Sequence, residues 1–253
     1  MSAPAQRIVK MLCVALGLFV LIASNDLRAS ENSARDLFKR GSQAYADGDF
    51  EKAASRFLES AAASPSSGTW HNLGDAEWQL GRTGPAILAW ERALWMNPYN
   101  TNAHSNLRFA RKAKLLDSPE LTWFEICSTW LPVNAWPWIA GLSLWVAVAM
   151  VILPGVFRLP RAGWHQAVAA AGLAIFLLSI PALVGIQSRA RIAVVLQRNT
   201  NLRLTPTADA QALAHLAAGE TVRLERERGN YVYARTEAGA GWIDRSQIAL
   251  IAD

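Results

Sequence analysis

Residues 133–157 read VNAWPWIAGLSLWVAVAMVILPGVF, and residues 167–186 read AVAAAGLAIFLLSIPALVGI. Neither stretch contains Asp, Glu, Lys or Arg. A helix of about 20 apolar residues, rising about 1.5 Å per residue, crosses a hydrocarbon core of about 30 Å. The sequence therefore predicts two transmembrane helices, at residues 133–157 and 166–186.

A short link joins the two stretches. It reads RLPRAGWHQ, residues 158–166, and contains Pro160 and Gly163, which favour a turn. Because connections are short and consecutive elements lie side by side, the two helices should form an antiparallel hairpin with both flanks in the same compartment. The side chains within the stretches are almost wholly apolar, whereas a transporter needs charged groups inside the membrane. Any activity should therefore reside in the flanks.

The composition fits polar domains attached to a membrane anchor. The chain has 253 residues, of which 52% are hydrophobic and 18% charged, and it contains 11 Trp. Its net charge of +5 is modest, and the basic residues are scattered rather than gathered in a stripe interleaved with aromatic residues. This distribution argues against nucleic-acid binding.

Residues 1–29 have the features of a secretory signal peptide. Arg7 and Lys10 precede an apolar run at residues 11–23, and small residues that suit cleavage follow it. The run is too short to span a membrane comfortably. An uncleaved anchor is the alternative, and it gives the same topology.

The signal also predicts the orientation of the chain. It directs the following segment out of the cytoplasm, so the hairpin should turn on the cytoplasmic side and the tail should return outside. Arg158 and Arg161 in the link agree with the excess of positive charge on cytoplasmic loops, whereas Arg189 and Arg191 after the second stretch disagree. With the signal as the deciding feature, both polar modules are expected on the extracytoplasmic side.

A repeat lies ahead of the apolar stretches. Two sets of Gly, Ala and Pro, each with twelve-residue spacing, stand 33 residues apart: Gly41, Ala53 and Pro65, then Gly74, Ala86 and Pro98. Small residues at the first two positions let antiparallel helices approach closely, and the prolines end the second helix of each pair. Gly48 and Gly81 release the chain at the intervening turns.

These residues resemble the tetratricopeptide repeat family, a helix–turn–helix repeat of about 34 residues. The family's pattern is met at Trp70, Leu73, Gly74, Ala86, Trp90, Ala93 and Pro98. A partial third unit, with His104, Asn106 and Leu107, should cap the array. The resemblance implies an all-α tetratricopeptide repeat module with a capping helix at residues 34–116. Because about three repeats are usually needed to bury a continuous core, a partner, a second copy or the membrane should complete it.

The inner helices of this family line a peptide-binding groove. The positions that correspond to the groove are Phe38, Ser42, Tyr45, His71, Asn72, Asp75, Trp78 and Asn106. The resemblance implies that these side chains contact a protein partner. The alternative is that the aromatic residues are packing and the polar groups are simply solvated.

Tryptophans cluster where the first transmembrane helix should enter the membrane. They are Trp123, Trp130, Trp136 and Trp138, and Trp164 stands at the far side. Tryptophan favours the headgroup layer, so the cluster indicates an aromatic belt in contact with the lipid bilayer rather than a ligand cage.

The tail, residues 192–253, changes to short alternating apolar runs separated by turns. About five strands in some sixty residues predict a small closed barrel. The segments 201–203, 219–220 and 241–243, with Asn-Leu-Arg, Gly-Glu and Gly-Trp-Ile, resemble the bacterial SH3-like domain. The resemblance implies a small all-β SH3-like barrel in which Tyr231 and Trp242 are either exposed binding aromatics or packing residues.

Catalytic motifs are not recognisable in the sequence. The four histidines lie in different segments without metal-ligand spacing, and neither a G-x-S-x-G motif nor a phosphate-binding glycine loop occurs. The sequence therefore predicts a protein that is not an enzyme and that has no cofactor and no metal site.

The order of the modules resembles the BatE-type proteins of the bacterial aerotolerance family. The resemblance implies a two-pass protein of the bacterial inner membrane that works beside von Willebrand A-domain membrane proteins and a MoxR-type ATPase in stress tolerance. The leading hypothesis is a multidomain membrane protein that acts as a non-catalytic scaffold. The alternative is a cell-wall sensor whose SH3-like tail binds peptidoglycan.

Overall fold

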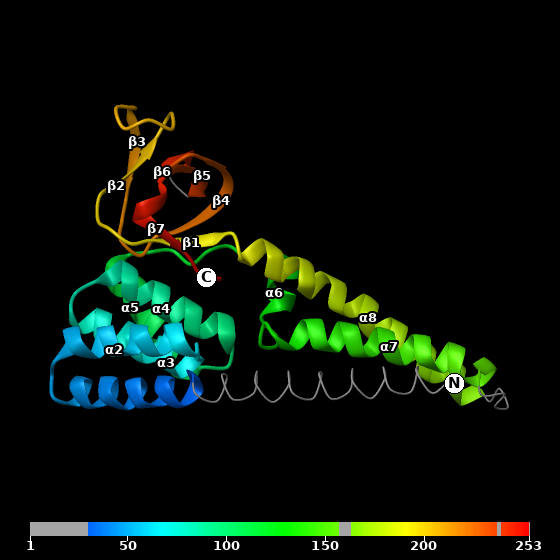
Figure 1. Ribbon diagram of the computed structural model, residues 1–253. Helices are drawn as coiled ribbons and strands as arrows, with labels where there is room; N and C mark the ends of the chain where they lie inside the picture. The colour runs from blue at the N-terminus through cyan, green and yellow to red at the C-terminus, as the bar shows by residue number, and fades with distance from the viewer. Residues whose placement is uncertain (1–29, 157–162, 237–238, 253) are drawn as a thin grey trace, which may run out of the picture.

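The structure is a computed structural model that describes residues 30–156, 163–236 and 239–252 (Figure 1). The predicted signal peptide and most of the link between the apolar stretches lie outside the described residues. The described chain has three parts: a stack of helices, two long apolar helices and an antiparallel sheet of seven strands. The prediction of helical parts combined with an all-β part is confirmed at this level.

Short helices form the stack. Residues 30–46 are helical, and α2 (Phe50–Ala63), α3 (Ser67–Gln79), α4 (Thr83–Met96) and α5 (Thr101–Lys114) follow. Asp49, Ser66 and Asn100 each accept a hydrogen bond from a backbone N–H in the first turn of the next helix. These caps satisfy donors that have no partner inside a helix, so they define where three of the helices begin.

The same packing occurs twice in the stack, 33 residues apart. A Cβ atom on Gly41 would lie 2.8 Å from the Phe57 ring, and one on Gly74 would lie 2.5 Å from the Trp90 ring. Both rings are almost completely buried. The glycines therefore allow each helix pair to close on an aromatic side chain, as the sequence repeat predicted.

The long helices are α7 (Ala135–Val156) and α8 (Gly163–Arg189), which lie side by side (Figure 1). Both are long and apolar enough to cross a membrane. The second helix extends three residues beyond its predicted end at residue 186, because the polar residues after the apolar stretch continue the same helix. This extension places Ser188 and Arg189 next to α6 (Trp123–Ser128), the short helix that precedes α7.

The sheet holds more strands than the sequence indicated. Its strands are β1 (Ile192–Val195), β2 (Thr200–Arg203), β3 (Ala212–Leu216), β4 (Thr221–Arg228), β5 (Tyr231–Thr236), β6 (Gly239–Asp244) and β7 (Ile248–Leu250). Their hydrogen-bonded order is β3-β2-β6-β5-β4-β1-β7, so the described strands end at β3 and β7 instead of closing the predicted five-stranded barrel. Strand β7 has only three residues, and β3 reads ALAHL, in which four of five residues are apolar, so neither shows the alternation of apolar and polar residues that marks a strand.

Strand β1 joins the sheet to the helical stack because it is buried on both faces. Ala193 and Val195 point into the core of the sheet, whereas Ile192 and Val194 belong to the core formed with the helices. Arg92 of α4 adds a polar contact, since its Nη2 donates a hydrogen bond to the carbonyl oxygen of Leu250 at 2.9 Å. The sheet is therefore packed directly on the helical stack.

Candidate functional site

Four of the predicted groove residues come together at one cavity. Ser42 and Tyr45 from the helix at residues 30–46, with Asn72 and Asp75 from α3, line a cavity of about 90 Å³. Phe57 from α2 completes the lining. The helical repeat places these side chains together because residues three or four apart share one face of a helix.

Asp75 is the centre of a hydrogen-bond network behind this cavity. Its Oδ1 accepts hydrogen bonds from Nδ2 of Asn106 at 2.7 Å and from Nε1 of Trp90 at 2.9 Å. The Nε2 atom of His71 lies 3.5 Å from Asp75 Oδ2. The network ties α3, α4 and α5 together, so three predicted groove residues also have a structural role.

The aromatic groove residues are largely occupied by packing. The Phe38 ring lies 5.6 Å from the Phe57 ring, measured between centroids. The Trp78 ring lies 5.8 Å from the Trp90 ring and 6.0 Å from the Phe109 ring, measured between centroids. Phe109 is 63% exposed and was not predicted, although it stands three residues after Asn106 on the same helix. It extends the aromatic surface next to Trp78.

The two aromatic residues predicted in the tail are not neighbours. Tyr231 pairs with Asp244 across β5 and β6, whereas Trp242 pairs with Tyr233. The Trp242 and Tyr233 rings meet edge to face at 5.3 Å, and the guanidinium of Arg226 lies 5.0 Å from the Tyr233 ring centre. Trp242 and Arg226 are therefore grouped around Tyr233, which sequence reasoning missed.

A buried carboxylate lies between the end of α8 and the sheet. Glu125 of α6 is fully buried, with 0% of its side chain exposed. Its Oε2 accepts a hydrogen bond from the backbone N–H of Thr122 at 2.8 Å, which closes the first turn of α6. The helix therefore holds the carboxylate in a fixed direction.

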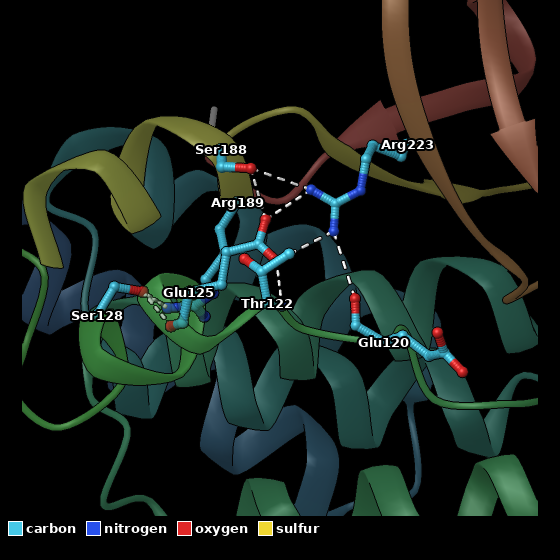
Figure 2. Close-up of polar contacts among 7 residues, drawn as sticks. All are labelled: Glu120, Thr122, Glu125, Ser128, Ser188, Arg189 and Arg223. Atoms are coloured by element: carbon cyan, nitrogen blue, oxygen red, sulfur yellow. Dashed lines mark hydrogen bonds and ion pairs between the residues drawn. The ribbon is translucent and has the colours of Figure 1, made fainter. Parts of the chain in front are cut away.

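Residues from α8 and β4 complete the environment of this carboxylate (Figure 2). Nη1 and Nη2 of Arg223 donate to Oε1 and Oε2 of Glu125 at 2.6 and 3.2 Å, and Oγ of Ser188 donates to Oε1 at 2.6 Å. Beside them, Arg189 Nη1 donates to Oγ of Ser128 at 3.2 Å. We call Glu125, Ser188 and Arg223 the junction cluster.

The junction cluster keeps Glu125 ionised. Burial raises the pKa of Glu125, but hydrogen bonds from Arg223, Ser188 and Thr122 outweigh it and lower the pKa from 4.5 to about 2. A two-pronged contact between a guanidinium and a carboxylate is among the strong charge-assisted hydrogen bonds in proteins. The cluster therefore joins the entry of α7, the end of α8 and the sheet.

Acid should weaken this junction in a defined pH range. Because the folded pKa lies below the unfolded value near 4.5, the ionised carboxylate stabilises the fold fully above about pH 4.5, and the stabilisation is lost as the pH falls through 2. The difference in unfolding midpoint between the natural chain and Glu125→Gln should be constant from pH 7 to 5 and then shrink. Thermal unfolding in lipid nanodiscs measures it, and a difference that stays constant down to pH 2 would contradict the assignment.

Two comparisons of the sequence with known proteins gave no match. No family model matches the sequence. No curated protein matches it either. Among residues 30–156, 163–236 and 239–252, no group of three His, Cys, Asp or Glu side chains could hold a metal ion.

Proposed function

We propose that this chain is a non-catalytic, membrane-anchored scaffold that binds a protein partner through its helical stack. The observation that carries the proposal is the cavity at which Ser42, Tyr45, Asn72 and Asp75 meet. These side chains come from two successive repeats, and they offer hydroxyl, amide and carboxylate groups to an incoming peptide.

The stack is assigned to the tetratricopeptide repeat class. Support comes from the two equivalent contacts, Gly41 with Phe57 and Gly74 with Trp90, and from positive φ angles at both Gly48 and Gly81. The sheet is assigned to the SH3-like class on the order of its sequence motifs. The order of signal, repeats, hairpin and sheet supports a BatE-type scaffold in the bacterial inner membrane, with both modules outside the cytoplasm.

The junction cluster supports a scaffold that is held at the membrane surface. An ion pair between α6 and β4 and a hydrogen bond from α8 to α6 connect the sheet to α8 and to the short helix that precedes α7. Such a connection restricts rotation of the polar modules relative to the bilayer. The proposed partners are therefore membrane proteins themselves, namely von Willebrand A-domain proteins, which in turn engage a MoxR-type ATPase.

Partner binding should depend on Asn72. In Asn72→Arg a long cationic side chain enters the cavity beside Asp75, so recovery of von Willebrand A-domain proteins should fall at least about tenfold, which corresponds to about 1.4 kcal/mol. Affinity purification of the tagged full chain from its native membrane, followed by mass spectrometry, measures this. The control is Asn102→Arg, the same change at an exposed position of α5. Equal recovery with both variants would refute binding at the cavity.

A second candidate function rests on the cluster of Tyr233, Trp242 and Arg226. An aromatic pair with an adjacent guanidinium on one sheet face is suited to a wall peptide or glycan, so the sheet would be a peptidoglycan sensor. The same purification distinguishes the two. Wall fragments that are recovered equally from the natural chain and Asn72→Arg, but not from Trp242→Ala, would move the function to the sheet.

A further inference from the structure

A second, larger cavity lies between the helical stack, the end of α8 and the sheet. Its volume is about 310 Å³, within the range of small-molecule sites. Leu94, Leu107, Leu121, Ile192 and Ile251 form most of its apolar wall. At about 30 Å³ per molecule of liquid water, the space equals about ten waters.

The charges around this cavity do not balance. Two guanidinium groups, Arg111 and Arg189, line it together with one carboxylate, Glu91. Arg111 pairs with Glu91 through Nη2, while its Nε is buried without a hydrogen-bond partner among the described residues. The Arg189 guanidinium stacks 5.0 Å above the Trp95 ring centre. The lining therefore carries two positive charges and one negative charge, and the excess positive charge lies next to apolar side chains.

A neighbouring cavity, which is also lined by the segment between α5 and α6, has a different balance of charges. That cavity measures about 680 Å³, and Asp117 and Glu120 face Arg223 and Arg235 around it. Two acidic and two basic side chains give no preference for a charged ligand. Positive charge also exceeds negative charge at two further cavities, one lined by Arg108, Arg111, Lys112 and Asp117 and the other by Lys114 and Arg198. The smaller cavity is distinguished by the mostly apolar wall beside its excess charge.

We propose that the smaller cavity binds an amphipathic monoanion, a single carboxylate or phosphate head that carries a short apolar chain. The apolar chain packs against Leu94, Leu107 and Ile251, and the head lies between Arg111 and Arg189. An anion bound there offsets the excess positive charge, which burial keeps away from water. This inference is independent of the partner-binding groove, because none of the residues that line the groove cavity lines this one.

The position of the cavity allows two sources for this anion. Thr129, which lies between α6 and α7, is part of the lining, so the cavity is close to the membrane entry of α7. A free acid in the aqueous phase and the headgroup region of an anionic lipid supply the same chemistry. A binding experiment can separate them by the lipid composition around the protein.

Hexanoate, an acid that fits the available space, is a suitable probe. Titrated into the full chain in nanodiscs of zwitterionic lipid, it should bind saturably by calorimetry, whereas hexanol and hexylamine should bind at least about tenfold more weakly. Anionic lipid in the nanodisc should compete with hexanoate if the bilayer is the source. Saturable binding without such competition assigns the aqueous source.

Two variants and a control test the location. Arg189→Gln removes one guanidinium, and Ser118→Phe blocks the cavity while both guanidinium groups remain, so each should weaken hexanoate at least about tenfold. Arg228→Gln, at an exposed position at the end of β4, should bind like the natural chain. Equal affinity for hexanoate and hexanol, or undiminished binding to Ser118→Phe, would overturn the proposal.

Discussion

Replacing Glu125 by Ala should lower the free energy of unfolding by about 3 to 5 kcal/mol, because removal of one member of a buried ion pair leaves the other charge uncompensated. Arg223 would lose the Oε1 and Oε2 contacts, and Ser188 would lose its acceptor. Two-thirds of the Arg223 side chain is buried, since 31% is exposed, so water restores only part of the lost interaction. The sheet should therefore separate from the apolar helices before the helical stack unfolds.

Equilibrium unfolding in detergent micelles measures the change, and hydrogen exchange of β4 amides locates it. The matched control is Glu227→Ala on β4, the strand that carries Arg223. Its ion pair with Arg245 is exposed on both sides and should contribute less than about 1 kcal/mol. Replacing both members, in Glu125→Leu with Arg223→Met, should recover much of the loss because no charge stays buried. If Glu125→Ala is as stable as Glu227→Ala, the junction cluster does not hold the modules together.

The apolar helices were predictable because their signal is local. A charge-free run of sufficient length specifies a helix that can cross a membrane, whatever the rest of the chain does. The helix pairs were predictable for a related reason. Gly41 and Gly74 recur at the spacing of the repeat, and each lies against the aromatic residue expected at its own repeat, Phe57 or Trp90.

The junction cluster was not predictable, because its members are distant in the sequence. Glu125 and Arg223 are 98 residues apart, and Glu125 and Ser188 are 63 apart. A local signal existed only for α6, in the spacing of Thr122 and Glu125 that is typical of a helix start. It indicates a cap, and it does not reveal that the carboxylate is buried against two other elements.

Strand register accounts for the missed aromatic pair. Sequence alternation shows which residues share a face of a strand, but the pairing of Trp242 with Tyr233 instead of Tyr231 depends on the turn between β5 and β6. If the pairing of β5 with β6 shifted by two residues, every side chain would stay on the same face of the sheet. The sequence therefore left the partner of Trp242 open.

The position of the sheet on the helical stack depends on close backbone contact at Gly84. A Cβ atom at this residue would lie 2.5 Å from the carbonyl oxygens of both Val195 and Leu196. The atoms in the way belong to the backbone at the end of β1, so no side-chain rotation relieves the contact. Because β1 is buried on both faces, a shift here disturbs the core of the sheet and the core of the helices together.

Gly84→Ala should accordingly destabilise the chain by about 2 to 3 kcal/mol, the cost of inserting a methyl group into a filled contact. Gly68→Ala is the matched control, since Gly68 is also the second residue of its helix and a Cβ there would meet nothing within 4 Å. The control should be neutral or more stable by up to about 1 kcal/mol, because alanine restricts the unfolded chain. Urea unfolding of both variants measures the difference, and hydrogen exchange of β1 should accelerate only in Gly84→Ala. Equal stability of the two variants would show that the sheet is not seated on the first turn of α4.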